Sequence, residues 1–148
     1  MNDKIKELSA IINKIPFNRT LGLQLEAIEK GQITMRFDMK EDLIGNFFHG
    51  ILHGGVTSAV LDMVGGAAAM ITTAQKHPEK NLQELGNILG KSGTINLHID
   101  YLRPGKGLHF IAKARILHSG NKITFAQMEL FNHDSVLIAT GSGAYLIG

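Results

Sequence analysis

Residues 53–62 read His-Gly-Gly-Val-Thr-Ser-Ala-Val-Leu-Asp and join a glycine-rich loop to a long run of small and apolar residues. Between Val56 and Thr73 there is no proline, and Asp62 is the only charged residue. Small or apolar side chains on every side indicate a helix that is buried all round. At 1.5 Å per residue this helix is expected to be about 27 Å long, which is enough to span a small domain.

The glycine pair Gly54-Gly55 lies where this helix begins. The first amides of a helix have no internal partner and carry the positive end of the helix dipole. Glycine also lets a ligand approach the backbone closely, because it has no Cβ. The pair is therefore predicted to hold an oxygen that gains negative charge, although a glycine pair before a helix also occurs as plain loop geometry.

Asp62 follows Gly54 by eight residues, a little over two helical turns, which is too far for both to serve one reacting atom within one chain. A symmetric partner would bring the two together. We favour a catalytic carboxylate that activates water or attacks directly, because burying an unpaired charge is costly. The alternative is a structural carboxylate satisfied by the hydroxyl of Thr57 or Ser58.

The composition favours one globular domain over residues 1–148, with 44% hydrophobic residues. The net charge of +2 argues against a strong nucleic-acid or membrane-surface footprint. The absence of cysteine excludes disulfides, thiolate metal sites and cysteine nucleophiles. The seven histidines are scattered without metal-ligand spacing, so neither a metal nor another cofactor is expected.

Two stretches bear on the compartment. The first seven residues alternate charge and lack the apolar core of a signal peptide, which predicts a cytoplasmic protein. Residues 51–71 are apolar enough to suggest a membrane span. They contain His53 and Asp62 and have no flanking lysines or arginines, so we predict a core helix and no membrane span.

The N-terminal half is predicted to hold a helix, a hairpin and a loop before the central helix. Asn2 or Asp3 can cap a first helix that ends because Pro16 forbids its continuation. Alternating residues 23–27 and 33–39 around the turn Glu29-Lys30-Gly31 predict a half-buried hairpin. Residues 40–52 are expected to form a loop, and a short helix is expected after Pro78.

From Thr94 onward the hydrophobic period is two, which predicts strands at 94–101, 108–118, 123–131 and 136–147. Three or four of them are expected to form a consecutive antiparallel meander. Gly141 and Gly143 suggest that something packs closely on the last strand. The whole pattern predicts an α+β domain in which an antiparallel sheet wraps one long helix.

This element order, with His53-Gly54-Gly55 and Asp62, resembles the hotdog-fold thioesterase superfamily, specifically its PaaI-like branch. The resemblance covers nearly the whole chain and is strongest at residues 100–107, Asp-Tyr-Leu-Arg-Pro-Gly-Lys-Gly, and 120–122, Gly-Asn-Lys. The C-terminal half is most similar to bacterial medium- and long-chain acyl-CoA thioesterases.

The resemblance implies a homodimer, often paired into a tetramer, with two active sites at the subunit interface. In such enzymes the amide that matches Gly54 polarises the thioester carbonyl, and the acid that matches Asp62 comes from the facing subunit. Asn46 resembles the asparagine that holds the nucleophile or thioester, but it lies one residue further from the motif than expected, which leaves His49 as the alternative. Thr94 falls where related enzymes place a hydroxyl that positions water; it is equally explained as an ordinary strand threonine.

The resemblance also implies where the substrate lies. His53 and Gly55 belong to the substrate-binding loop, in which His53 orders the loop rather than acting as a base. Four residues in turns are expected near the phosphates of coenzyme A: Arg103, Lys106, Asn121 and Lys122. The small residues 65–69 either allow close packing or leave an acyl channel bordered by Met63, Met70, Phe47 and Phe48.

The leading hypothesis is hydrolysis of medium- to long-chain acyl-CoA to a free fatty acid and coenzyme A. One alternative is a non-catalytic acyl-thioester binding protein, against which the buried carboxylate argues. Another is a hotdog hydratase or dehydratase, which should need a catalytic histidine together with a carboxylate.

Overall fold

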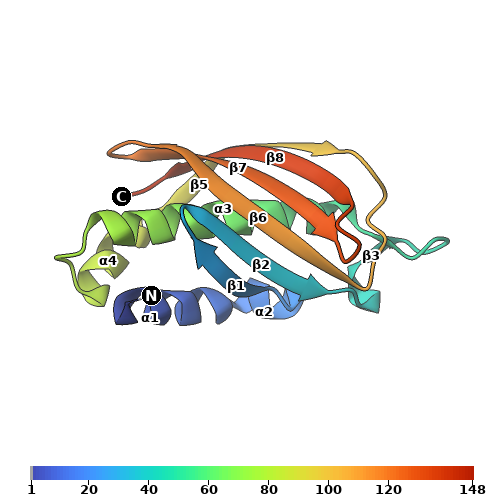
Figure 1. The fold of residues 1–148 in the computed structure, drawn as a ribbon, viewed down its shortest axis with the longest axis horizontal. Coiled ribbons are helices and arrows are strands. Elements are labelled where there is room, and N and C mark those ends of the chain that lie inside the picture. The colour runs from blue at the N-terminus through green and yellow to red at the C-terminus, as the bar shows by residue number, and fades with distance from the viewer. Residues whose placement is uncertain (1) are drawn as a thin grey trace.

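The computed structural model describes residues 2–148 and builds them as a curved sheet around one long helix (Figure 1). Along the chain the helices and strands are α1 (Asp3–Asn13), α2 (Pro16–Leu21), β1 (Gln24–Glu29), β2 (Gln32–Asp38), a 3₁₀ turn (Glu41–Leu43), β3 (Ile44–Asn46), β4 (Ile51–Leu52), α3 (Gly54–Lys76), α4 (Leu82–Leu89), β5 (Gly93–Tyr101), β6 (His109–Ser119), β7 (Ile123–Asn132) and β8 (Leu137–Leu146).

The main sheet has six antiparallel strands in the order β1-β2-β6-β7-β8-β5. Its strands run obliquely over α3, while α1 lies alongside on the open side (Figure 1). Alternate residues of β2, β6 and β7 are buried against the helix, among them Met35, Ala112 and Met128. This arrangement confirms the predicted hotdog fold.

The meander predicted with three or four strands is confirmed with three. β6, β7 and β8 pair consecutively, but β5 pairs only with β8 and forms an edge of the sheet. Residues 102–108 therefore carry the chain from that edge across to β6 instead of making a hairpin turn. Period-two alternation predicts a strand and its faces, but it does not say which strand is its neighbour.

The N-terminal helix begins as predicted and, also as predicted, does not continue through Pro16. The Asn2 side chain caps α1 by accepting a hydrogen bond from the Ile5 amide at 2.9 Å. The helix ends at Asn13, and Pro16 opens a second helix, α2, that the sequence did not predict. Proline suits the first helical position, because its fixed φ is already helical and its missing N–H is not needed there.

Residues 40–52 form a 3₁₀ turn and a two-stranded hairpin, β3–β4, where a loop was expected. This hairpin projects from the end of the molecule at which α3 begins (Figure 1). The short helix expected after Pro78 is confirmed as α4, which starts with a reciprocal capping box between Asn81 and Glu84. The hairpin turn predicted at residues 29–31 is also confirmed, with Lys30 and Gly31 at positive φ.

The central helix is 23 residues long, or about 35 Å at 1.5 Å per residue. By length and composition alone it would suffice to cross a membrane, and half of its most apolar window is buried inside the protein. The expectation that it is buried all round is wrong for this chain. Asp62, Met63, Gly66 and Met70 remain half-buried and form a second face directed away from the sheet core.

Candidate active site

The first turn of α3 has two amides in different situations. Gly55 donates its N–H to Nδ1 of His53 at 2.7 Å, so His53 is the N-cap of the helix. Because Nδ1 accepts this hydrogen bond, the neutral ring carries its proton on Nε2. Within residues 2–148 the Gly54 N–H has no hydrogen-bond partner, and Gly54 is exposed. The geometry therefore leaves the Gly54 N–H as the amide that can donate a hydrogen bond to a ligand oxygen.

Tyr101 of β5 contacts the first turn of α3. Its hydroxyl donates a hydrogen bond to the Gly54 carbonyl at 3.0 Å, and a Cβ added to Gly54 would lie 3.4 Å from the Tyr101 ring. The Gly54 amide is thus held between the cap of His53 and the ring of Tyr101. Sequence reasoning did not identify Tyr101 as part of the site.

Asp62 is half-buried, and its partner is Thr94 of β5. The Thr94 hydroxyl donates to Asp62 Oδ1 at 2.8 Å. The hydroxyl that bonds this carboxylate is that of Thr94 rather than that of Thr57 or Ser58, and the Ser58 hydroxyl bonds the Gly55 carbonyl. The structure thus joins two residues that lie 32 positions apart in the sequence. Since Thr94 occupies only one lone pair of one oxygen, the carboxylate can still accept from a water or approach a carbonyl carbon.

Tyr145 of β8 contacts the turn of α3 that carries Asp62. Its hydroxyl donates to the Asp62 main-chain carbonyl at 3.1 Å. Burial, followed by the negative charge of Asp62 and a hydrogen bond to it, raises the pKa of the Tyr145 phenol far above its ordinary value. The phenol therefore stays protonated, and remains a donor, at alkaline pH where an exposed tyrosine would ionise. The Tyr145 ring fits because Gly65 and Gly143 leave space for it, as predicted for the last strand.

A pocket of about 160 Å³ adjoins the carboxylate. Its walls combine a polar end at Asp62 and Thr94 with an apolar end that includes Met63, Gly66 and Met70. A polar end beside an apolar one suits a ligand with a reactive head and an aliphatic chain. Phe47 and Phe48 do not line this pocket. They stack on each other at the tip of the β3–β4 hairpin, 76% and 80% exposed, so the prediction that they border the channel is wrong for the isolated chain.

Gly54 and Asp62 are eight residues apart on one continuous helix, about 12 Å along its axis. One small reacting group cannot contact both within one chain. Gly54 instead lines a second, wider pocket of about 400 Å³, together with Tyr101, Arg103 and Pro104. The chain therefore presents the amide and the carboxylate in two separate pockets.

The four residues expected near coenzyme A phosphates do not form one cluster. Arg103 and Lys106 precede β6, whereas Asn121 and Lys122 follow it, and this strand of 11 residues is roughly 36 Å long at 3.3 Å per residue. Arg103 also donates to the Leu137 carbonyl at 2.9 Å, which fixes its loop. These residues can surround one ligand only if two chains contribute, and their role stays a prediction.

Asn46 lies in β3, where its side-chain oxygen accepts a hydrogen bond from the Phe48 amide at 3.1 Å. This contact closes the tip of the hairpin. Asn46 and its alternative, His49, are both exposed and do not line the Asp62 pocket. Either could meet a ligand held by a second chain, and their part in catalysis stays a prediction.

Comparisons with known proteins agree with this architecture. The family model of the thioesterase superfamily matches residues 49–139. The chain is 40% identical over 134 residues to the medium/long-chain acyl-CoA thioesterase YigI of Salmonella typhimurium, and 39% identical to YigI of Escherichia coli; each match covers 90% of this chain and 86% of the relative. A crystal structure from Shewanella oneidensis, described as related to the thioesterase superfamily, superposes with a TM-score of 0.91 at 36% identity and covers 97% of this chain and 95% of that one. The chain belongs to the thioesterase superfamily.

Proposed function

We propose that this protein hydrolyses medium- to long-chain acyl-CoA thioesters to a free fatty acid and coenzyme A. The observation that carries the proposal is the Asp62–Thr94 pair, in which a half-buried carboxylate receives a 2.8 Å hydrogen bond at the mouth of an apolar pocket. A carboxylate beside aliphatic side chains suits a reactive thioester with an acyl chain behind it. The names of the YigI relatives support the same substrate class.

The chemistry requires an electrophile, a nucleophile and an exit for the thiolate. The Gly54 N–H donates to the thioester oxygen as it gains negative charge. The Asp62 carboxylate either removes a proton from an attacking water or attacks the carbonyl carbon itself, forming an anhydride that water then opens. In both routes the C–S bond breaks, the coenzyme A thiolate leaves and takes up a proton, and the acyl group leaves as a carboxylate. Thr94 holds Asp62 in position.

The active protein is proposed to be a homodimer or a higher homo-oligomer with shared sites. The 12 Å separation along α3 supports this assembly, because a facing chain would place its Asp62 opposite the first chain's Gly54. The unpaired β5 edge offers a surface for it, since Ile95, Tyr101 and Leu102 are about half exposed there.

The direct test measures thiol release from acyl-CoAs between acetyl and palmitoyl, with phenylacetyl-CoA included, for wild type and Asp62→Asn. The substitution is nearly isosteric, so the fold and acyl-CoA binding should survive while turnover falls about a hundredfold or more. Asp42→Asn is the control, because Asp42 is an exposed aspartate outside both pockets. Binding without turnover in wild type would instead support an acyl-thioester binding protein, and unchanged turnover in Asp62→Asn would remove Asp62 from the mechanism.

A complementation experiment tests the shared site. Gly54→Pro removes the N–H while keeping the helix, because proline is favoured at the first helical position, and Gly54→Ala keeps the N–H as its control. Each of Gly54→Pro and Asp62→Asn should be inactive alone. When they are unfolded and refolded together, half of the dimers should be mixed and have one intact site of two, which restores roughly a quarter of wild-type activity. Absence of any recovery, with mixed dimers demonstrated, would place amide and acid in the same chain.

A further inference from the structure

A cleft of about 210 Å³ lies between α1, α4 and the C-terminal half of α3. Every residue that lines it is aliphatic, methionine or glycine; they include Leu8 and Ile12 of α1, Met70 of α3, and Leu85, Gly86 and Leu89 of α4. One side opens to solvent beside Ile11, which is 49% exposed. An apolar cleft that is partly open to water suits an apolar ligand, because occupation would remove that surface from water.

This cleft adjoins the Asp62 pocket through two shared walls. Met70 and Leu89 line both cavities. On α3, Asp62, Gly66 and Met70 recur every four residues and therefore share one helix face, so the distance from carboxylate to Met70 is about 12 Å along the axis. Methionine is flexible enough to move aside for a chain. The face of α3 thus leads from the acid to the cleft.

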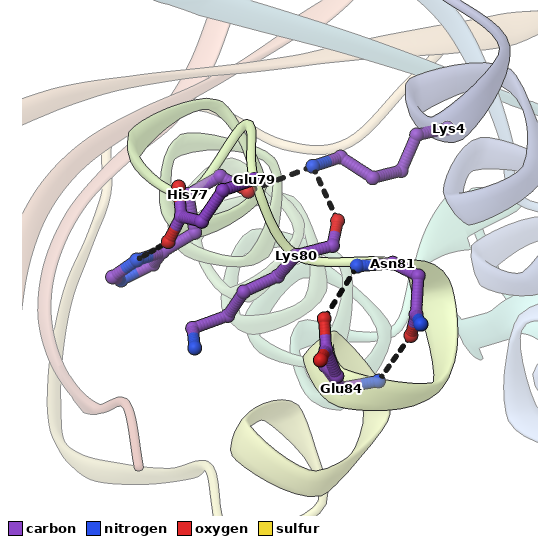
Figure 2. Close-up of polar contacts among 6 residues, drawn as sticks. All are labelled: Lys4, His77, Glu79, Lys80, Asn81 and Glu84. Atoms are coloured by element: carbon purple, nitrogen blue, oxygen red, sulfur yellow. Dashed lines mark hydrogen bonds and ion pairs between the residues drawn. The ribbon is translucent and has the colours of Figure 1, made fainter.

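Polar contacts between residues outside the cleft lining tie together the helices that form the cleft (Figure 2). Lys4 of α1 donates from Nζ to the main-chain carbonyls of His77, at 2.8 Å, and Lys80, at 2.9 Å, and so ties α1 to the segment between α3 and α4. The Asn81–Glu84 capping box fixes the first turn of α4. The cleft is therefore part of the folded chain before any ligand arrives.

We propose that the distal end of a long acyl chain passes between Met70 and Leu89 into the α1–α4 cleft, so that these two helices set the accepted chain length. The inference rests on the proposed thioesterase function and adds where the distal end of the acyl chain is bound. Neither cavity alone, at 160 and 210 Å³, reaches the roughly 300 Å³ of a small ligand pocket, whereas the two combined exceed it. A medium chain ends near Met70, and only a long chain enters the cleft.

The test fills the cleft from Gly86. A Cβ added there meets no atom within 4 Å, and helical Gly86 tolerates a side chain, so Gly86→Phe should fold and place a ring in the cleft. Asn87→Phe is the matched control, because it adds the same ring one position along α4 at an exposed site outside the cleft. Thermal unfolding at one protein concentration checks that both variants are folded.

The readout is the ratio of kcat/KM for palmitoyl-CoA to that for hexanoyl-CoA. We expect Gly86→Phe to lower this ratio about tenfold or more, because displacing a methylene from an apolar pocket alone costs on the order of tenfold. Asn87→Phe should leave the ratio within about twofold of wild type, since a surface change away from the site has little effect. Equal ratios in all three proteins would overturn the inference and leave the thioesterase function intact.

A binding measurement separates the inference from the proposed function. Titration of free palmitate into wild type, Gly86→Phe and Asn87→Phe by calorimetry needs no turnover. If wild type released no thiol from any acyl-CoA, the proposed function would fail, and this titration would still decide about the cleft. Weaker palmitate binding in Gly86→Phe than in Asn87→Phe supports the cleft as the chain terminus, and equal binding refutes it.

Discussion

Replacement of Gly65 by alanine should lower the free energy of unfolding, whereas replacement of the adjacent Gly66 by alanine should raise it. A Cβ on Gly65 would lie 2.3 Å from Tyr145 Oη and 2.8 Å from its Cζ, closer than real Cβ atoms come to other atoms. A Cβ on Gly66 would lie 3.7 Å from the same ring, an ordinary contact. The two positions share one helix, so the intrinsic gain of alanine over glycine is the same at both, about 1 kcal/mol.

The loss of stability in Gly65→Ala is estimated from the packing and the hydrogen bond that the displaced Tyr145 ring would lose. Tyr145 is 3% exposed and packed among core residues, so its displacement counts as overpacking, at about 1–3 kcal/mol. Its hydrogen bond to the Asp62 carbonyl is lost as well, at about 0.5–1.5 kcal/mol. After the helix gain is subtracted, Gly65→Ala should be destabilised by about 0.5–3.5 kcal/mol, whereas Gly66→Ala should be stabilised by up to about 1 kcal/mol.

Urea denaturation followed by circular dichroism measures both free energies of unfolding, at one fixed protein concentration because the proposed assembly would contribute to apparent stability. Adding Tyr145→Phe to Gly65→Ala should recover part of the loss, since Oη makes the shortest contact. If Gly65→Ala were as stable as Gly66→Ala, the close packing of Tyr145 on α3 would be refuted.

Two further predictions concern Thr94 and Tyr145. Thr94→Val keeps the side-chain shape but removes the donor to Asp62. A hydrogen bond to a charged group contributes up to about 1.5–3 kcal/mol, so the unfolding free energy should fall by no more than that amount, while kcat should fall about tenfold to a hundredfold because the acid is no longer held in place. Unaltered kcat would show that Thr94 does not hold the acid. Because the folded pKa of Tyr145 is raised, its contribution to stability is complete below about pH 10 and is lost as pH rises toward the folded pKa. Tyr145→Phe should therefore lose less stability than wild type between pH 9 and pH 11, measured by urea denaturation, and parallel curves would contradict the burial of the phenol.

The fold was largely predictable because its signals are local. Period-two alternation predicts β6, β7 and β8, and their turns identify a meander. The position of a strand within the sheet is not a local signal. β5 is an edge strand because residues 102–108 cross the sheet to β6 rather than forming a hairpin. Residues 16–21 were missed for a related reason. Pro16 is read as a stop, although the same restricted φ also starts a helix.

The sequence alone points to a candidate site residue only where that residue type is unusual among its neighbours. A lone aspartate in an apolar helix stands out without any structure, and Asp62 was found in that way. Thr94 came from the resemblance alone, because a threonine in a strand is ordinary. Tyr145 gave no signal of its own. Its place depends on the missing Cβ of Gly65, eighty residues earlier in the chain, and only the folded packing relates the two.

The adjacent glycines explain how one helix serves both a core and a pocket. Neighbouring helical residues point about 100° apart, so Gly65 and Gly66 open different sides of α3. On the first side the missing Cβ admits the Tyr145 ring, which holds the Asp62 carbonyl from β8. On the second side it contributes to the pocket that adjoins Asp62 and leads toward Met70. A larger residue at Gly65 would displace the Tyr145 ring that holds the Asp62 carbonyl, and a larger one at Gly66 would narrow the pocket beside Asp62. The helix therefore has two small residues in succession at the boundary between the face that packs against Tyr145 and the face that lines the pocket beside Asp62.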